Sequence, residues 1–275
     1  TGSRPMKSIV MSFMSVASTT YTPGPAVGEG RLLYDSDMND MTIDFIGLEP
    51  VQDNLTSALL VVNGTSANNA INYTAGTTGG PFFTGPSGLV SVDGFETIEF
   101  NNKAALTINA GAGNDTISLN NGTTPTGLTG ITVNGGDPTS SGDTLVVNDL
   151  AGGNTVTIAT TTNTITGAEP VPVVYGTIEA ISLTTSVAGA EVAFTGSANY
   201  TVNPGAETDE GTILTDADPA VSFFGYGLGE TIDFTAAIAN VTVNGTDNND
   251  AFTVAANNDV TITGRATIEN IAGST

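Results

Sequence analysis

A short phrase recurs along this chain and limits what it can fold into. It consists of apolar residues or Thr in alternation, then Asn or Asp, and usually Gly. The five clearest copies are LLVVNGT (59–65), LVSVDGF (89–95), ALTINAG (105–111), ITVNGGD (131–137) and VTVNGTD (241–247). Period-two alternation is typical of a strand with one buried face, and Asn, Asp and Gly tolerate the positive φ of a sharp turn. The phrase predicts short strands with corners between them.

This alternation also predicts which side chains point inward. The pairs that we expect to be buried are Leu106 with Ile108, Ile117 with Leu119, and Val241 with Val243. A one-residue shift in the register would turn every one of them towards solvent.

A longer repeat lies above the short one. MTIDF (41–45), DTLVV (143–147) and ETIDF (230–234) resemble one another, and each follows an acidic, turn-rich stretch. The spacing predicts an N-terminal strand and linker with a role in assembly, two full units, and a partial third unit, all within one continuous β domain. The proposed boundaries are 1–30, 31–129, 130–215 and 216–275.

Two all-β architectures fit units of this size. One is a parallel β-solenoid, a stack of coils of about 20 residues each. The other is a row of immunoglobulin-like sandwiches of about 100 residues each. We favour the solenoid because the phrase recurs inside each unit, at spacings such as 16 residues from Asp93 to Asn109.

Composition excludes several kinds of chemistry. The sequence contains no Cys, His or Trp, so disulfides, Ser–His and Cys–His nucleophile pairs, and His or Cys zinc sites are ruled out. Its 28 acidic and 5 basic residues give a net charge of −23, which repels nucleic acid and anionic membranes and attracts cations. No apolar run reaches the ~18 residues of a membrane span. We therefore expect neither nucleic-acid partners nor membrane insertion.

The segment AGAGNDTIS (110–118) is the sharpest local motif. It resembles the glycine-rich nonapeptide of haemolysin-type calcium-binding repeats, with Gly111, Gly113, Asp115 and Ile117 on the motif and Ala110 in place of its first Gly. The resemblance implies a parallel β-roll in which Asp115, beside Asn114, binds calcium between coils. More widely, residues 35–275 resemble the Thr-, Asn- and Gly-rich repeat regions of bacterial secreted surface proteins and adhesins.

Other acidic turns extend the predicted set of calcium ligands. Calcium prefers oxygen ligands, and the expected ones outside the nonapeptide are Asp35, Asp37, Asp143, Asp216, Asp218, Asp247 and Asp250. The alternative for each is a solvated turn that binds no ion. The stretch DSDMND (35–40) starts like an EF-hand loop but has Asp40 where that loop needs Gly and Ile46 where it needs Glu, so an EF-hand is rejected.

The N-terminal stretch from Met6 to Ser18 has two interpretations. It resembles a short signal peptide, with Lys7 followed by an apolar run and small residues. It also fits a strand with Ile9, Met11 and Phe13 on one face, which is the interpretation we favour.

Together these patterns predict a non-enzymatic, extracellular or cell-surface structural protein. The first hypothesis is a subunit of a fibre or layer whose copies add head to tail through the strand 6–16. The second is a repeat segment of a calcium-binding adhesin, with surface glycans as partners. The third is a carbohydrate-active β-helix enzyme, although no pair of carboxylates stands out in its context.

Overall fold

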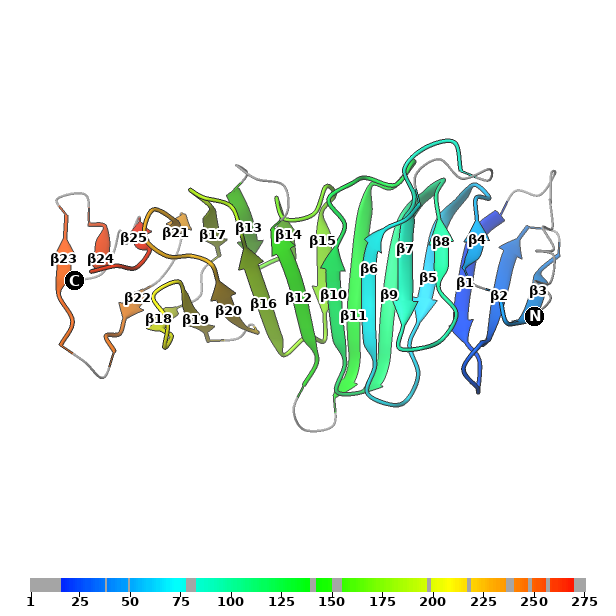
Figure 1. The fold of residues 1–275 in the computed structure, drawn as a ribbon, viewed down its shortest axis with the longest axis horizontal. Coiled ribbons are helices and arrows are strands. Elements are labelled where there is room, and N and C mark those ends of the chain that lie inside the picture. Colours follow the sequence, from blue (N-terminus) through cyan, green and yellow to red (C-terminus); the bar gives the residue numbers. More distant parts are fainter. Residues whose placement is uncertain are drawn as a thin grey trace, which may run out of the picture.

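The computed structural model describes residues 16–269 apart from positions 38, 49, 78–82, 139–141, 150–154, 197–198, 217–218, 236–239, 247–248 and 256–257. The described residues form strands and turns but no helix, and hence no helix that could cross a membrane. The strands build two large sheets that run along the long axis of the molecule (Figure 1). This is the predicted all-β, solenoid-like stack, and it forms in place of a row of sandwiches.

The first sheet has fourteen strands. In spatial order they are β23 (Phe252–Val254), β24 (Val260–Ile262), β25 (Thr267–Glu269), β21 (Thr231–Thr235), β17 (Glu191–Thr195), β13 (Thr155–Ala159), β14 (Thr164–Thr166), β15 (Val173–Gly176), β11 (Gly130–Pro138), β9 (Lys103–Gly113), β5 (Ser57–Asn63), β1 (Val16–Pro23), β2 (Glu29–Ser36) and β3 (Met41–Ile46).

The second sheet has eleven strands. In spatial order they are β22 (Val241–Val243), β18 (Tyr200–Pro204), β19 (Glu210–Thr215), β20 (Ala220–Phe224), β16 (Ala180–Thr185), β12 (Thr144–Asp149), β10 (Thr116–Asn120), β6 (Ala70–Ala75), β7 (Gly88–Val92), β8 (Ile98–Phe100) and β4 (Val51–Asp53).

Parallel ladders connect successive coils. In the first sheet β1, β5, β9 and β11 pair in parallel, and in the second sheet β6, β10, β12 and β16 do the same. The chain alternates between the sheets, so each coil contributes a strand to both. Parallel neighbours keep equivalent corners stacked above one another.

Three-stranded antiparallel meanders interrupt this parallel pattern. Within the stack they are β6–β7–β8, β13–β14–β15 and β18–β19–β20. In each of them the third strand pairs in parallel with an earlier coil, and the first strand pairs in parallel with a later coil. Two more meanders, β1–β2–β3 and β23–β24–β25, stand at the two ends.

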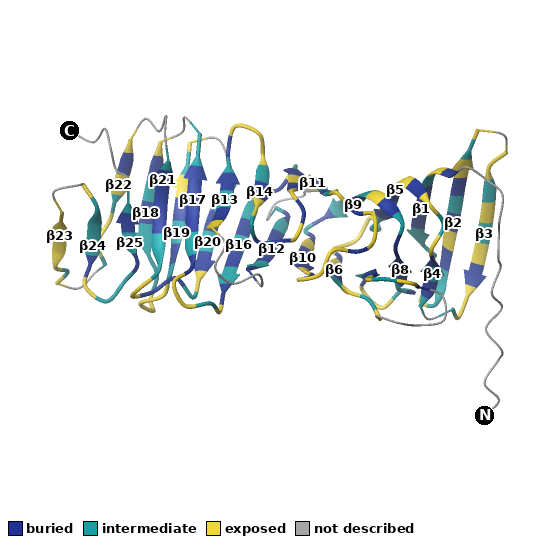
Figure 2. Cartoon of the chain, turned by 90° about the horizontal axis from the view of Figure 1, so that it is seen from above, coloured by how far each residue is buried: buried dark blue, intermediate teal, exposed yellow. Residues whose placement is uncertain are grey.

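The core lies between the sheets, as the alternation of buried and exposed residues along each strand indicates (Figure 2). Of the six residues predicted to point inward, Leu106, Ile108, Ile117 and Leu119 are fully buried and Val241 is buried as well. The sixth, Val243, is partly buried and packs against the core. The period-two pattern therefore identified the buried face correctly.

The corners differ from the prediction at two places. The turns at Gly64, Gly94 and Gly245 follow strand ends as expected. By contrast, Asn109 and Asn134 lie inside the long strands β9 and β11, whose pairing continues to Gly113 and Pro138. These strands bend without ending, because Gly111 and Gly136 take positive φ values of 111° and 121° while the ladder between them is kept.

Asparagine side chains form a ladder along this bend. Asn109 Nδ2 donates to Asn63 Oδ1 at 3.0 Å, and Asn134 Nδ2 donates to Asn109 Oδ1 at 2.9 Å. The three residues are in register on adjacent strands, so one amide satisfies the next. The repeated Asn of the sequence phrase thus links coils as well as turning the chain.

The N-terminal segment is part of the stack from Val16 onward, since β1 pairs in parallel with β5. Residues 1–30 were expected to be a strand and a linker. The proposed boundary at residue 30 falls inside β2, which runs from Glu29 to Ser36. The predicted strand 6–16, with Ile9, Met11 and Phe13, lies outside the described residues except for Val16, the first residue of β1.

Candidate functional site

Four residues at one corner of the stack form the most distinctive polar cluster. Each comes directly before a parallel strand of the second sheet: Asn69 before β6, Asp115 before β10, Asp143 before β12 and Glu179 before β16. The strands are in register, with Thr116 opposite Ala70 and Thr144. We call these four residues the corner column.

Hydrogen bonds run along the corner column in one direction. The backbone N–H of Asn69 donates to Asp115 Oδ1 at 2.7 Å, and that of Asp115 donates to Asp143 Oδ1 at 2.7 Å. The N–H of Asp143 donates to Glu179 Oε2 at 2.6 Å. Each carboxyl group therefore satisfies a corner amide of the preceding coil, which would otherwise lack an acceptor. At the start of the column, Asp93 accepts from the side-chain amide of Asn69.

Burial sets the chemistry of the two central acids. Asp115 and Asp143 are 1% and 0% exposed, and the Oδ2 atom of each has no hydrogen-bond partner among the described residues. Burial raises the pKa of Asp115, with a smaller contribution from the charges of Asp143 and Asp93. Burial likewise raises the pKa of Asp143, with a further contribution from Glu179. These carboxyl groups therefore retain a proton more readily than exposed ones.

The arrangement brings together two of the predicted calcium ligands, Asp115 and Asp143. However, among the residues that the structure describes, no group of three or more Asp or Glu side chains is arranged to hold a metal ion. Calcium binding stays a prediction. Asn114, the neighbour of Asp115 in the nonapeptide, is partly exposed, and its N–H donates to Asn68 Oδ1 at 3.0 Å.

The other predicted ligands lie away from the corner column. Asp35 and Asp37 are exposed, at the end of β2 and in the turn that follows. Asp216 is exposed after β19 and accepts from the side-chain amide of Asn199. Asp250 accepts from the backbone N–H of Thr246 at 2.6 Å. Asp218 and Asp247 lie outside the described residues.

Several buried polar groups were not among the residues singled out from the sequence, among them Glu169, Glu99 and the pair of Asp53 and Lys103. Glu169, 5% exposed, accepts from the N–H of Asn121 at 3.3 Å, and burial raises its pKa to about 8. Glu99 accepts from Ser87, Gln52 and Thr77. Asp53 and Lys103 form an ion pair with no exposed side-chain surface. Only the last carried a signal in the sequence, because Lys103 is the single basic residue between Arg31 and Arg265.

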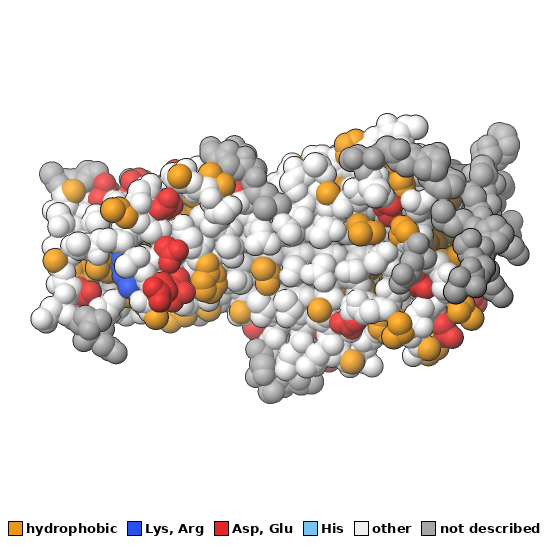
Figure 3. All heavy atoms as spheres, viewed as in Figure 1, with side chains coloured by type: hydrophobic (Ala, Val, Ile, Leu, Met, Phe, Trp, Pro, Cys, Tyr) orange, Lys and Arg blue, Asp and Glu red, His pale blue; other side chains and the backbone are white. Residues whose placement is uncertain are grey.

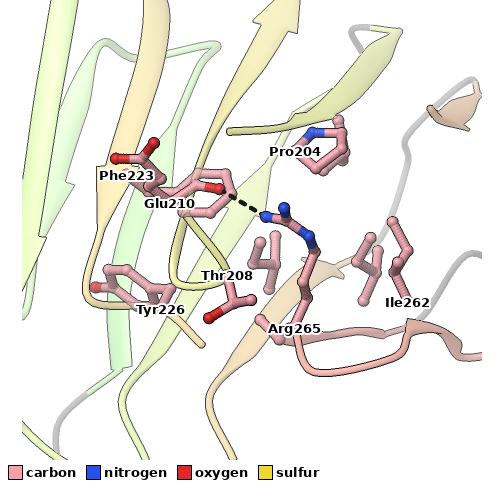
Figure 4. Close-up of a pocket in the computed structure, with 11 residues that line it drawn as sticks. Pro204, Thr208, Glu210, Phe223, Tyr226, Ile262 and Arg265 are labelled. Carbon is pink, nitrogen blue, oxygen red and sulfur yellow. Dashed lines mark hydrogen bonds between the residues drawn. The ribbon is translucent and has the colours of Figure 1, made fainter. Parts of the chain in front are cut away.

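A small pocket lies near the C-terminal end, between the β18–β19 hairpin and the turn from β24 to β25 (Figure 4). Its lining is mostly apolar and includes Val202, Phe223 and Ile262. The guanidinium group of Arg265 closes one side by donating to the backbone carbonyls of Glu207 at 2.7 Å, Gly205 at 2.9 Å and Glu210 at 3.3 Å. Arg265 thus joins the two sheets at this end.

Comparison with protein-family models, curated protein sequences and solved structures finds no match for this chain. Its function is therefore inferred from its own geometry.

Uncharged polar side chains and backbone dominate the face seen in Figure 3, with a few acidic clusters and little basic surface.

Proposed function

We propose that this chain is a structural subunit of an extracellular fibre or surface layer, and that copies of it add head to tail by strand pairing. The observation that supports this proposal is the pairing rule of the meanders. Inside the stack, the third strand of each meander pairs in parallel with a strand that comes earlier in the chain. The first strand of each meander pairs in parallel with a strand that comes later. At the ends, β3 is a third strand and β23 a first strand, and each is paired on one side only within the described sheet.

The side chains at these two edges favour contact between copies. Ile46 on β3 is 76% exposed, and Val254 on β23 is 67% exposed. Phe252, also on β23, is exposed as well. In the second sheet β4 and β22 are likewise the outermost strands, one at each end. The unpaired edge of a sheet is prone to pair with another chain. A contact that joins unlike ends of two copies generates a filament when the rotation between the copies does not close a ring.

The composition is consistent with a surface location. The large negative charge keeps copies soluble before assembly, and a stack of Thr, Asn and Gly corners needs no disulfides. The strand predicted at residues 6–16 precedes β1 and could add a further strand to a neighbouring copy.

The adhesin alternative is supported by a different observation, the unpartnered Oδ2 atoms of Asp115 and Asp143 in the corner column. Calcium binding there would stabilise the folded state by mass action. Excess chelator should then lower the melting temperature, and Asp115→Ala should remove part of the difference. An unchanged melting curve would leave the fibre proposal as it stands and remove the calcium alternative.

The test of the fibre proposal is an edge substitution. Lysine on an outer strand blunts pairing, so Ile46→Lys should abolish filaments in negative-stain images and leave a folded monomer in sedimentation velocity. The matched control is Leu228→Lys, because Leu228 is 77% exposed and lies outside β3 and β23. Filaments that persist in Ile46→Lys, or a wild-type chain that stays monomeric at high concentration, would contradict the proposal.

A second variant tests whether the predicted strand 6–16 forms the joint, that is, the contact between neighbouring copies. Deletion of residues 1–15 leaves β1 intact, because β1 begins at Val16. Loss of filaments with a folded monomer would assign the joint to the predicted strand. Filaments of normal length would instead assign it to the outer edges of β3 and β23.

A further inference from the structure

Lys103 and Asp53 meet inside the stack at its N-terminal end. Lys103 is the first residue of β9 in the first sheet, and Asp53 is the last residue of β4 in the second sheet. Lys103 Nζ lies 2.9 Å from Asp53 Oδ2, and neither side chain has any exposed surface. A nitrogen nucleophile and a carboxyl group are thus held in contact where bulk water does not reach.

The backbone of Leu55 holds both groups at once. Its N–H donates to Asp53 Oδ1 at 3.1 Å, and its carbonyl oxygen accepts from Lys103 Nζ at 2.5 Å. The first contact places a donor on the oxygen where negative charge would develop during attack on the carboxyl carbon. The second contact orients the amine. Together they fix two reacting groups in the kind of geometry that lowers the entropic barrier to reaction.

We propose that Lys103 and Asp53 form an intramolecular isopeptide bond once the chain has folded. Two opposite charges without exposed surface are costly to keep, because the interior solvates neither. Transfer of one proton from the ammonium to the carboxylate converts the ion pair into a neutral amine and a neutral acid, which are the reactive forms. Burial lowers the pKa of Lys103, although the charge of Asp53 opposes this.

The reaction needs no other reactant. The Nζ lone pair attacks the Asp53 carboxyl carbon, a C–N bond forms, and the carbonyl π electrons move to the oxygen that accepts from Leu55 N–H. The C–O bond to the hydroxyl group then breaks. The hydroxyl group leaves with one proton from the nitrogen as a water molecule, and the product is a neutral secondary amide.

The position of the bond indicates that it would anchor an edge strand. β4 is the outermost strand of the second sheet and pairs only with β8 among the described strands. A covalent link from β4 to β9 would prevent this short strand from peeling away, and it would close a loop that contains β5 to β8. A cross-link of this kind restricts the unfolded chain. The inference does not depend on filament formation, since a monomer would carry the same bond.

Intact-mass measurement of the full chain tests the proposal directly. We expect the wild-type chain, fully denatured, to be lighter than its sequence mass by one water molecule. The variants Lys103→Arg and Asp53→Ala should each show the full mass. These masses are read from denatured chains, so the result does not require the variants to be stable.

Tryptic digestion gives an independent readout with internal controls. An amide on Nζ blocks cleavage after Lys103, while cleavage after Arg31 and Arg265 is unaffected. The denatured wild-type chain should therefore yield one fragment from Leu32 to Arg265, with Asp53 linked to Lys103 in its fragment spectrum. Lys103→Arg should be cut at position 103. A wild-type chain of full mass that trypsin cuts after Lys103 would overturn the proposal and leave an ordinary buried ion pair.

Discussion

The two halves of the stack are held together in different ways. In the N-terminal region, residues 16–149, the strands reach 11 residues in β9 and 9 in β11, whereas each of the last four strands, β22 to β25, has 3. The N-terminal region also buries most of the charged side chains in the described interior: Asp53, Glu96, Glu99, Lys103, Asp115, Asp143 and Asp149. The C-terminal region, residues 155–269, buries only Glu169 and Asp233 among its described residues.

Three buried aromatic rings of the C-terminal region lie closer together than the ring pairs of the N-terminal region, Tyr21 with Phe45 and Tyr73 with Phe100, at 6.2 and 6.3 Å. The rings of Phe194, Phe234 and Tyr200 form a cluster with centroid separations of 5.5, 5.6 and 4.9 Å.

Directional hydrogen bonds of buried polar groups link the coils in the N-terminal region. In the C-terminal region the ring cluster is added to amide bonds that also link coils, from Asn240 Nδ2 to Asn199 Oδ1 at 2.9 Å and from Asn244 Nδ2 to Asn203 Oδ1 at 2.7 Å. The same architecture can therefore be specified by two kinds of side chain, with different responses to mutation and to pH.

The largest expected effect is the loss of a ring from the aromatic cluster. Phe194→Ala should lower the free energy of unfolding by about 3–5 kcal/mol, because it removes a fully buried side chain and leaves a cavity. In a stack each coil is stabilised by its neighbours, so residues 191–235 should lose hydrogen-exchange protection before β9 and β11 do. Phe224→Ala is the control, since Phe224 is 40% exposed. Simultaneous loss of protection in both regions would argue that the stack unfolds as one unit.

The next effect is a change of stability with pH at the junction of the two regions. Glu169 has a folded pKa of about 8 against an ordinary value of 4.5, so its contribution is fully present below pH 4.5 and is lost as the pH rises towards 8. Between pH 4.5 and 7 the loss is about 3–4 kcal/mol, from 2.5 pH units at ~1.4 kcal/mol each. Melting temperatures across this range measure it.

Glu169→Gln should flatten this pH dependence, while Glu207→Gln, at an exposed position, should leave it in place. The raised pKa values of Asp115 and Asp143 act in the same direction, so Asp143→Asn should flatten it further. A wild-type chain that becomes more stable between pH 4.5 and 7 would refute the assignment of neutral buried acids.

The smallest effect concerns the asparagine ladder. Asn109→Ala removes one donor and one acceptor and should cost about 1 kcal/mol in a denaturant titration. Asn120→Ala, at an exposed position of β10, is the control and should cost less. Equal effects for the two variants would mean that the ladder contributes nothing specific to the N-terminal region.

Local patterns in the sequence predicted the class of fold and the buried face. The alternation around Leu106 and Ile117 is a property of a few adjacent residues, and the structure confirms it. The meanders could not be predicted in this way. Whether Val173 or Thr155 lies next to β11 depends on contacts between distant strands, and both segments are short strands rich in β-branched residues.

The sequence predicted two members of the corner column, Asp115 and Asp143, but not that the four residues stack on one another, for a related reason. Asn69 and Asp115 each follow the repeated Asn by six residues, at Asn63 and Asn109, but Asp143 follows Asn134 by nine. The longer loop hides the equivalence in the sequence, while the parallel register of β10 and β12 restores it in the fold. The pairing of Asp53 with Lys103 depends on contact between the two sheets, which no local motif encodes.

In each meander inside the stack, the last strand in the sequence pairs with the earlier coil, and the first strand pairs with the later coil. This order affects how the chain acquires its structure during synthesis or export. β13 leaves the ribosome or a secretion channel before β15, yet β15 is the strand that docks on β11. β13 therefore has no template until the whole segment Thr155–Gly176 has emerged. Folding from the N-terminus should advance in steps, with a pause at every meander, because long-range pairing waits for the distal strand. During each pause an open edge is exposed, and another chain in the same state can occupy it.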